Sequence, residues 1–186
     1  MGKLRFSSAR EVFEAFPTLG EDLMLEPNAD SPFHYLQILR GSDTPEDGVT
    51  FSAYVLDRRE TVWWACQCLR LLIPGVETRD PALRAAEDWV YAPDEDKRLA
   101  ALRLGTEEDR QRPTTWLSLA AGWSGGNIAP PGVPGVVPSP PHYTARAVRI
   151  AVLSALALVP ARDRAEKLGR CLDGALHMMR EPRETA

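Results

Sequence analysis

The chain has few cysteines, no long apolar run and no strong excess of charge of one sign. Its three cysteines are too few for a disulfide framework, and an odd number cannot all pair within the chain. This cysteine content favours a reducing compartment. The longest apolar run, 150–159, contains one serine and is far shorter than the about 20 residues of a membrane span. The amino terminus also lacks an apolar segment of signal-peptide length. We therefore expect a cytoplasmic protein with no membrane contact.

The charge balance and the motif content exclude several further classes of protein. A formal net charge of -4 argues against a general nucleic-acid-binding protein, because phosphate binding needs a basic face. Cys66 and Cys68 lie two residues apart, so on a helix their side chains point about 200° away from each other and cannot share a metal ion. The histidines lack HExxH spacing, and no Walker or Rossmann glycine pattern occurs. The sequence thus predicts no catalytic residue, no metal and no cofactor.

Helix signals dominate what is present. Three capping residues stand directly before a proline, at Ser31-Pro32, Thr44-Pro45 and Asp80-Pro81, as is typical of helix starts. No segment shows a convincing strand pattern. We predict one all-α domain over 1–186, an irregular bundle of about eight or nine helices. The expected helices are 8–16, 32–40, 45–56, 58–73, 81–92, 95–104, 113–123, 143–158 and 161–180.

The prolines at the starts of three expected helices raise the possibility of a repeat. Pro45, Pro81 and Pro113 lie 36 and 32 residues apart, which is the spacing of helix-pair solenoids. The residues between them do not repeat. The irregular bundle is therefore the favoured arrangement, with solenoid-like helix pairs as the alternative.

A proline- and glycine-rich loop, 125–141, interrupts the helical pattern. Six of its seventeen residues are proline and four are glycine, so it cannot be helical. One interpretation is that the loop wraps over the bundle and buries its aliphatic residues, Ile128, Val133, Val136 and Val137. The alternative is an extended segment, including Pro130 and Pro131, that recruits a partner. Exposed apolar residues are costly, so we favour the wrapped form.

One face of the expected helix 58–73 carries the strongest candidate binding residues. This helix is apolar almost all round, and such helices are normally central. Its polar line contains Glu60, Gln67 and Arg70, and Trp63 falls on the same line, whereas Trp64 falls on a core face. The structural interpretation is that Trp63 covers the core while Arg70 extends over it. The functional interpretation is a partner-binding set of Trp63, Gln67 and Arg70.

A second candidate set lies where the loop enters the next helix. Arg146 and Arg149 stand on one face near the start of that helix, where cations oppose the helix dipole and require an anion nearby. A neighbouring aspartate or glutamate is the ordinary explanation. The alternative is a ligand-binding site for a phosphate or an acidic partner, with His142 and Thr144 alongside.

Several short segments together resemble an uncharacterised bacterial family that is encoded near type VI secretion genes in proteobacteria. The segments are Ala-Arg-Glu-Val-Phe at 9–13, Thr-Pro-Glu-Asp at 44–47, Arg-Glu-Thr-Val-Trp-Trp-Ala-Cys at 59–66, Gly-Trp-Ser-Gly-Gly at 122–126, and the proline-rich run into His-Tyr-Thr-Ala at 142–145. The resemblance implies a cytoplasmic accessory to effector loading or secretion assembly. The family has no assigned catalytic residues, so no residue role is carried over.

The favoured function is therefore a non-enzymatic protein-interaction or adaptor factor, with a secretion effector or its carrier as partner. Two alternatives remain open at the level of the sequence. One is a helical protein that binds a small anionic ligand between its helices. The other is an immunity protein that neutralises a toxin, which the acidic balance fits slightly, although a net charge of -4 is too mild to decide.

Overall fold

The computed structural model describes residues 5–76, 80–129 and 133–180. Within these residues every regular element is a helix, and ten helices are present, which confirms the all-α prediction. Their bounds are α1 Ala9–Ala15, α2 Leu19–Asp22, α3 Pro32–Arg40, α4 Asp47–Val55, α5 Arg58–Leu72, α6 Pro81–Tyr91, α7 Glu95–Glu107, α8 Pro113–Gly122, α9 Tyr143–Ala157 and α10 Ala161–Arg180.

All nine predicted helices are present, each with ends within three residues of the predicted bounds. The starts follow from local capping: the Asp80 carboxylate accepts hydrogen bonds from the Ala82 and Leu83 amides, both at 3.0 Å. Only α2 was missed. It has four residues, which is barely one turn and too short to show any periodicity.

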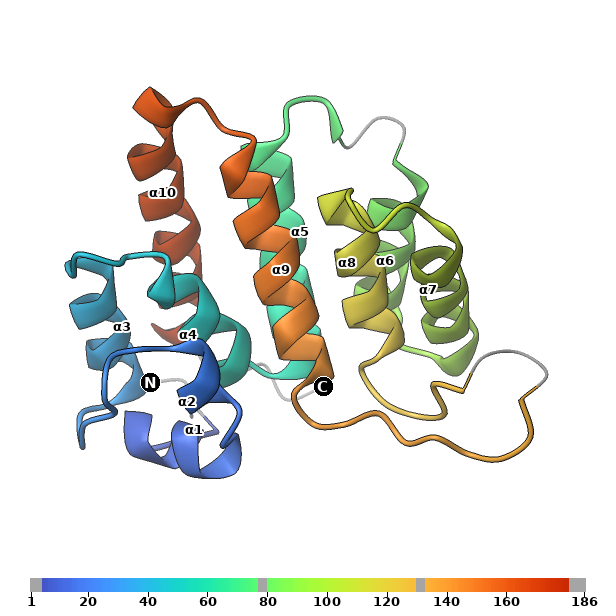
Figure 1. The fold of residues 1–186 in the computed structure, drawn as a ribbon, viewed down its shortest axis with the longest axis horizontal. Helices are drawn as coiled ribbons and strands as arrows, with labels where there is room; N and C mark the ends of the chain where they lie inside the picture. The colour runs from blue at the N-terminus through green and yellow to red at the C-terminus, as the bar shows by residue number, and fades with distance from the viewer. Residues whose placement is uncertain (1–4, 77–79, 130–132, 181–186) are drawn as a thin grey trace.

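Helices α5 and α9 lie side by side in the middle of an irregular bundle (Figure 1). Helices α3, α4 and α10 flank this pair on one side, with α1 and α2 at one end, and α6, α7 and α8 flank it on the other. Helix α5, which the sequence marked as apolar almost all round, therefore lies at the centre beside α9, where neighbours cover it from both directions.

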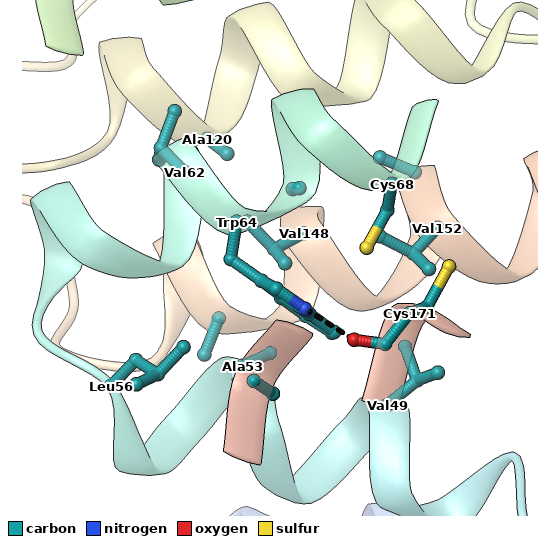
Figure 2. Packing of buried hydrophobic residues seen from close by; sticks show 14 of the residues in the cluster. Val49, Ala53, Leu56, Val62, Trp64, Cys68, Ala120, Val148, Val152 and Cys171 are labelled. Atoms are coloured by element: carbon teal, nitrogen blue, oxygen red, sulfur yellow. Dashed lines mark hydrogen bonds between the residues drawn. The ribbon is translucent and has the colours of Figure 1, made fainter. Parts of the chain in front are cut away.

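Trp64 anchors the centre of the core. Its side chain is 2% exposed, and its indole Nε1–H donates to the Cys171 carbonyl oxygen at 2.9 Å, as Figure 2 shows. Since Cys171 belongs to α10, this bond ties the central helix α5 to the last helix of the chain. A buried indole N–H needs such an acceptor, because an unpaired polar group in a core is costly.

Helices α7 and α8 approach each other very closely at two glycines. A Cβ atom on Gly105 would lie 2.6 Å from the Leu119 Cγ, and one on Gly122 would lie 2.6 Å from the Leu102 Cα. Neither distance is compatible with a real side-chain atom. The absence of side chains at these two positions allows the close packing of α7 against α8.

The 125–141 loop is held at its base by two arginines. Arg58 donates from Nη1 to the Ser124 carbonyl at 2.6 Å. Arg98 donates from Nη1 to the Gly122 carbonyl at 2.6 Å and from Nη2 to the Asn127 carbonyl at 3.2 Å. The Arg98 side chain is only 4% exposed, and its charge is balanced by Glu95, which accepts from Nε at 2.7 Å.

Beyond its base the loop doubles back as a hairpin. The Ile128 amide donates to the Val137 carbonyl at 2.9 Å, and the Asn127 side-chain oxygen accepts from the Val137 amide at 2.8 Å. The expectation that the three valines are buried against the bundle is wrong: Val133, Val136 and Val137 are 51%, 77% and 47% exposed. The two arms of the hairpin satisfy each other's polar groups, so the loop projects from the bundle instead of covering it (Figure 1). Pro130 and Pro131 lie outside the described residues.

Candidate functional site

A groove runs between α5 and α6 and contains all three residues of the predicted partner-binding set. We call it the α5–α6 groove; its volume is about 920 Å³. The residues that line it are Arg59, Glu60, Trp63, Gln67, Arg70, Glu87, Asp88, Val90 and Tyr91. Trp63, Gln67 and Arg70 are thus brought together along one side of the groove, at the spacing of successive helical turns.

Two aromatic rings are exposed in this groove. Trp63 is 45% exposed, whereas its neighbour Trp64 is 2% exposed, which confirms the predicted edge and core positions. Tyr91, the last residue of α6, is 87% exposed. The sequence analysis missed Tyr91. Its position at the end of an amphipathic helix was visible, but the meeting of that end with the Trp63 face of α5 was not.

The polar groups of the groove are largely organised by two arginines. Arg70 forms a bidentate pair with Glu87, with Nε–Oε1 at 2.7 Å and Nη2–Oε2 at 2.9 Å. Arg59 donates from Nε to the Val90 carbonyl at 2.7 Å, where its charge suits the negative end of the α6 dipole. These contacts hold α6 against α5 in a defined register. Such half-exposed pairs contribute little to stability, so their main effect is on the shape of the groove.

The net charge of the groove lining is slightly negative. Two arginines face three acidic residues, and both arginines are engaged as described above. Asp88 lies on the exposed face of α6 and lines the same groove as the two aromatic rings. The arrangement therefore offers two ring faces and a carboxylate, which are the groups that attract a cationic side chain.

The two arginines of the second predicted set, Arg146 and Arg149, have polar partners within the protein. Arg146 donates from Nε to Asp22 at 2.9 Å and from Nη2 to Glu21 at 2.6 Å, and these carboxylates raise the pKa of the guanidinium. Arg149 donates to the Thr50 hydroxyl at 3.1 Å. The compensating anions are thus acidic residues of α2, in agreement with the ordinary explanation of the two arginines.

The two remaining members of that set lie at the start of α9. The Thr144 hydroxyl is buried and donates to the Ala120 carbonyl at 3.2 Å. Partial burial, and then the nearby Arg146 charge, lower the pKa of His142 below its usual value. The four residues of the set are neighbours on one end of α9, but Arg146 already has carboxylate partners. Whether they bind a ligand stays a prediction.

The three cysteines are free thiols in the core. Burial raises the pKa of the Cys66 and Cys68 thiols well above the usual range, which keeps both protonated at neutral pH. Within the described ranges, no three His, Cys, Asp or Glu residues are grouped so that they could hold a metal ion. None of the helices in the part of the chain that the structure describes has the length and apolar character needed to cross a bilayer.

Comparison with protein families matches residues 35–179, about three quarters of the chain, to a family of unknown function, DUF6931. The chain belongs to this family. The DUF6931 region begins within α3 and ends near the end of α10, so it contains the whole α5–α6 groove. Helices α1 and α2 precede it. No curated protein and no solved structure shows a significant match.

Proposed function

We propose that this DUF6931 protein is a non-enzymatic adaptor that binds a helical segment of another protein in the α5–α6 groove. The observation that carries the proposal is the exposure of two aromatic rings, Trp63 and Tyr91, in one groove whose polar groups are already organised. Tryptophan, tyrosine and arginine are the residues most enriched among those that dominate binding energy at protein interfaces.

The length of the groove supports a helical partner. Along α5 it extends from Arg59 to Arg70, which corresponds to about 16 Å of helix. This is about three turns, enough for an amphipathic helix to place apolar residues at i, i+3 or i+4, and i+7 against Trp63 and Tyr91. The partner helix would pack against both α5 and α6 as a third helix.

The charges in the groove support a basic residue on the partner helix. Asp88 and the two ring faces would receive a lysine or arginine side chain through ion pairing and cation–π attraction. A partner with an acidic residue at that position would meet Asp88 and the Arg70-bound Glu87 with like charge. Electrostatic complementarity of this kind sets specificity more than affinity.

The biological context of the proposal comes from the resemblance of the chain to proteins encoded near type VI secretion genes. Membership of DUF6931 assigns no activity. In the proposed role, the partner helix belongs to a secretion effector or to its carrier, and the adaptor presents this partner for loading or assembly.

A photo-crosslinking experiment tests the proposal. A photoreactive amino acid replaces Gln67 in the groove, and in a control variant it replaces Arg162, whose side chain is 86% exposed on α10. After irradiation in a lysate of the organism that encodes the protein, mass spectrometry identifies the crosslinked peptide. We expect Gln67, and not Arg162, to capture a protein through a segment with an amphipathic helical pattern and a basic residue.

A binding measurement then distinguishes specific binding in the groove from non-specific crosslinking. The captured segment is synthesised and titrated against the full chain and its Trp63→Ala and Tyr91→Ala variants. Loss of a central aromatic residue should weaken binding by about 30-fold or more, the effect of about 2 kcal/mol. Equal capture at both positions, or equal affinity of the variants, would contradict the proposal.

A further inference from the structure

A second cavity lies at the point where α5 and α9 begin. We call it the α5–α9 cavity; its volume is about 500 Å³. Its wall includes the first turns of both helices, the end of α4 and residues from the N-terminal segment, among them Arg5 and Phe16. This cavity is separate from the α5–α6 groove, and none of its lining residues lines that groove.

The start of α9 carries no capping group of its own. Its N-cap residue, His142, has helical backbone angles and makes no side-chain capping hydrogen bond, and the first turn contains no acidic residue. By contrast, α5 begins with a capping box formed by Asp57 and Glu60. The Tyr143 amide donates to the Pro140 carbonyl at 3.1 Å. The next amides of the first turn have no intrahelical acceptor, so the start of this 15-residue helix presents donors and a partial positive charge. Two residues of that turn, Thr144 and Ala145, line the cavity.

A buried hydroxyl group in the cavity wall also lacks a partner. Thr61 is 1% exposed and lines the cavity from α5. Its Oγ1 makes no hydrogen bond within the part of the chain that the structure describes. Leaving a buried hydroxyl without a partner destabilises a protein, so proteins generally supply one. This orphan group is independent of the α9 terminus and indicates that something else completes the site.

The charges around the cavity favour an anion. Among the described residues that line it, Arg5 and Arg58 stand against one carboxylate, that of Asp57, so these residues together carry one net positive charge. Arg5 lies 3.8 Å from Asp57, and Arg58 extends from the cavity to the Ser124 carbonyl. Apart from Tyr54, Thr61 and Thr144, the remaining described residues of the wall are apolar and include Phe16 and Leu56.

We propose that the α5–α9 cavity binds a small organic anion. Its acidic group would accept hydrogen bonds from the Thr61 hydroxyl and from the first-turn amides of α9, close to the Arg5 and Arg58 guanidinium groups. Its apolar part would pack against Phe16 and Leu56. The anion thereby caps α9 and satisfies the orphan hydroxyl at once. This site goes beyond the proposed adaptor role, because no residue of the α5–α6 groove takes part.

The test uses the full chain and three probes: sodium benzoate, sodium phosphate and, as a cationic counterpart, benzylamine hydrochloride. Amide chemical shifts are followed by NMR during each titration. We expect benzoate to shift the Thr144 and Ala145 amide signals in a saturable way, phosphate to shift them more weakly because it lacks the apolar part, and benzylamine to leave them unchanged.

Two variants and a control show whether the named contacts bind the anion. Thr61→Val keeps the shape of the side chain and removes only the hydroxyl, so it should fold at least as stably and bind benzoate about tenfold or more weakly. Arg5→Gln should also weaken binding, whereas Arg162→Gln on α10 should not. The proposal is overturned if benzoate leaves the α9 amides unshifted, or if Thr61→Val binds it as tightly as the parent protein. Equal shifts from benzylamine would also overturn it, since they would show adhesion without charge selection.

Discussion

Replacing Arg98 by alanine should remove the hydrogen bonds that hold the base of the 125–141 loop and should destabilise the whole bundle. The Arg98 guanidinium is buried, and it supplies donors to the Gly122 and Asn127 carbonyls. Each hydrogen bond from a charged donor contributes about 1.5–3 kcal/mol, and the carbonyl of the buried Gly122 would be left without this donor. Pairing with Glu95 adds little, because that carboxylate is 59% exposed. We expect a loss of about 3–5 kcal/mol in the free energy of unfolding.

Urea denaturation followed by circular dichroism measures this loss, and hydrogen exchange locates it. With a slope of about 2 kcal/mol per molar urea, the midpoint of Arg98→Ala should fall by about 2 M. The Ile128 and Val137 amides, which lie in the hairpin, should lose protection first. Arg98→Lys keeps the charge but cannot reach both carbonyls with a planar fork, so it should be intermediate.

Lys97→Ala is the matched control, since the neighbouring Lys97 is half-exposed and pairs with Asp94 at the start of the same helix. Its removal should cost less than about 1 kcal/mol. If Arg98→Ala lowered the free energy of unfolding no more than the Lys97→Ala control does, and the hairpin amides kept their protection, the idea that Arg98 holds the loop would be refuted.

Three further measurements probe other parts of the fold. Gly122→Ala should cost about 1–3 kcal/mol in thermal or urea unfolding, because its Cβ would overlap the Leu102 Cα. Gly20→Ala, with no atom within 4 Å of the added Cβ, should cost nothing measurable. The cysteines of the native protein should resist a thiol reagent and react on unfolding, because they are buried; fast labelling of the native chain would contradict this. By NMR, His142 should titrate below its usual value of 6.5. The unfolded chain then binds more protons between the lowered pKa and 6.5, so stability should fall as the pH decreases through that window, and His142→Gln should remove this dependence.

The helices and their faces could be predicted because the interactions behind them are local. Capping pairs such as Asp80-Pro81 act within a few residues, and so does the spacing that separates Trp63 from Trp64. The one missed helix, α2, is too short for such a signal. It nevertheless supplies Glu21 and Asp22, the carboxylates that balance Arg146 more than a hundred residues later.

Only part of each candidate site could be predicted from the sequence, because only the interactions within one helix are local. One side of the α5–α6 groove, with Trp63, Gln67 and Arg70, lies on a single helix and could be read from its periodicity. The opposite side depends on how α6 packs against α5, and no local pattern places Tyr91 there. The α5–α9 cavity shows this still more clearly, since its wall comes from segments far apart in the chain.

The sequence by itself determined the all-α class, the positions of nine helices to within three residues at each end, and which faces of those helices are apolar. Packing between distant segments determined the rest: the partner of each face, the projection of the 125–141 loop from its arginine clamp, and the residues that meet in the groove and in the cavity. The physical reason is that the two kinds of interaction act over different distances along the chain. Hydrogen bonds and side-chain spacing within a helix involve residues three or four apart. Burial of apolar surface, by contrast, stabilises any two apolar faces that fit, so which faces pack together depends on the whole chain.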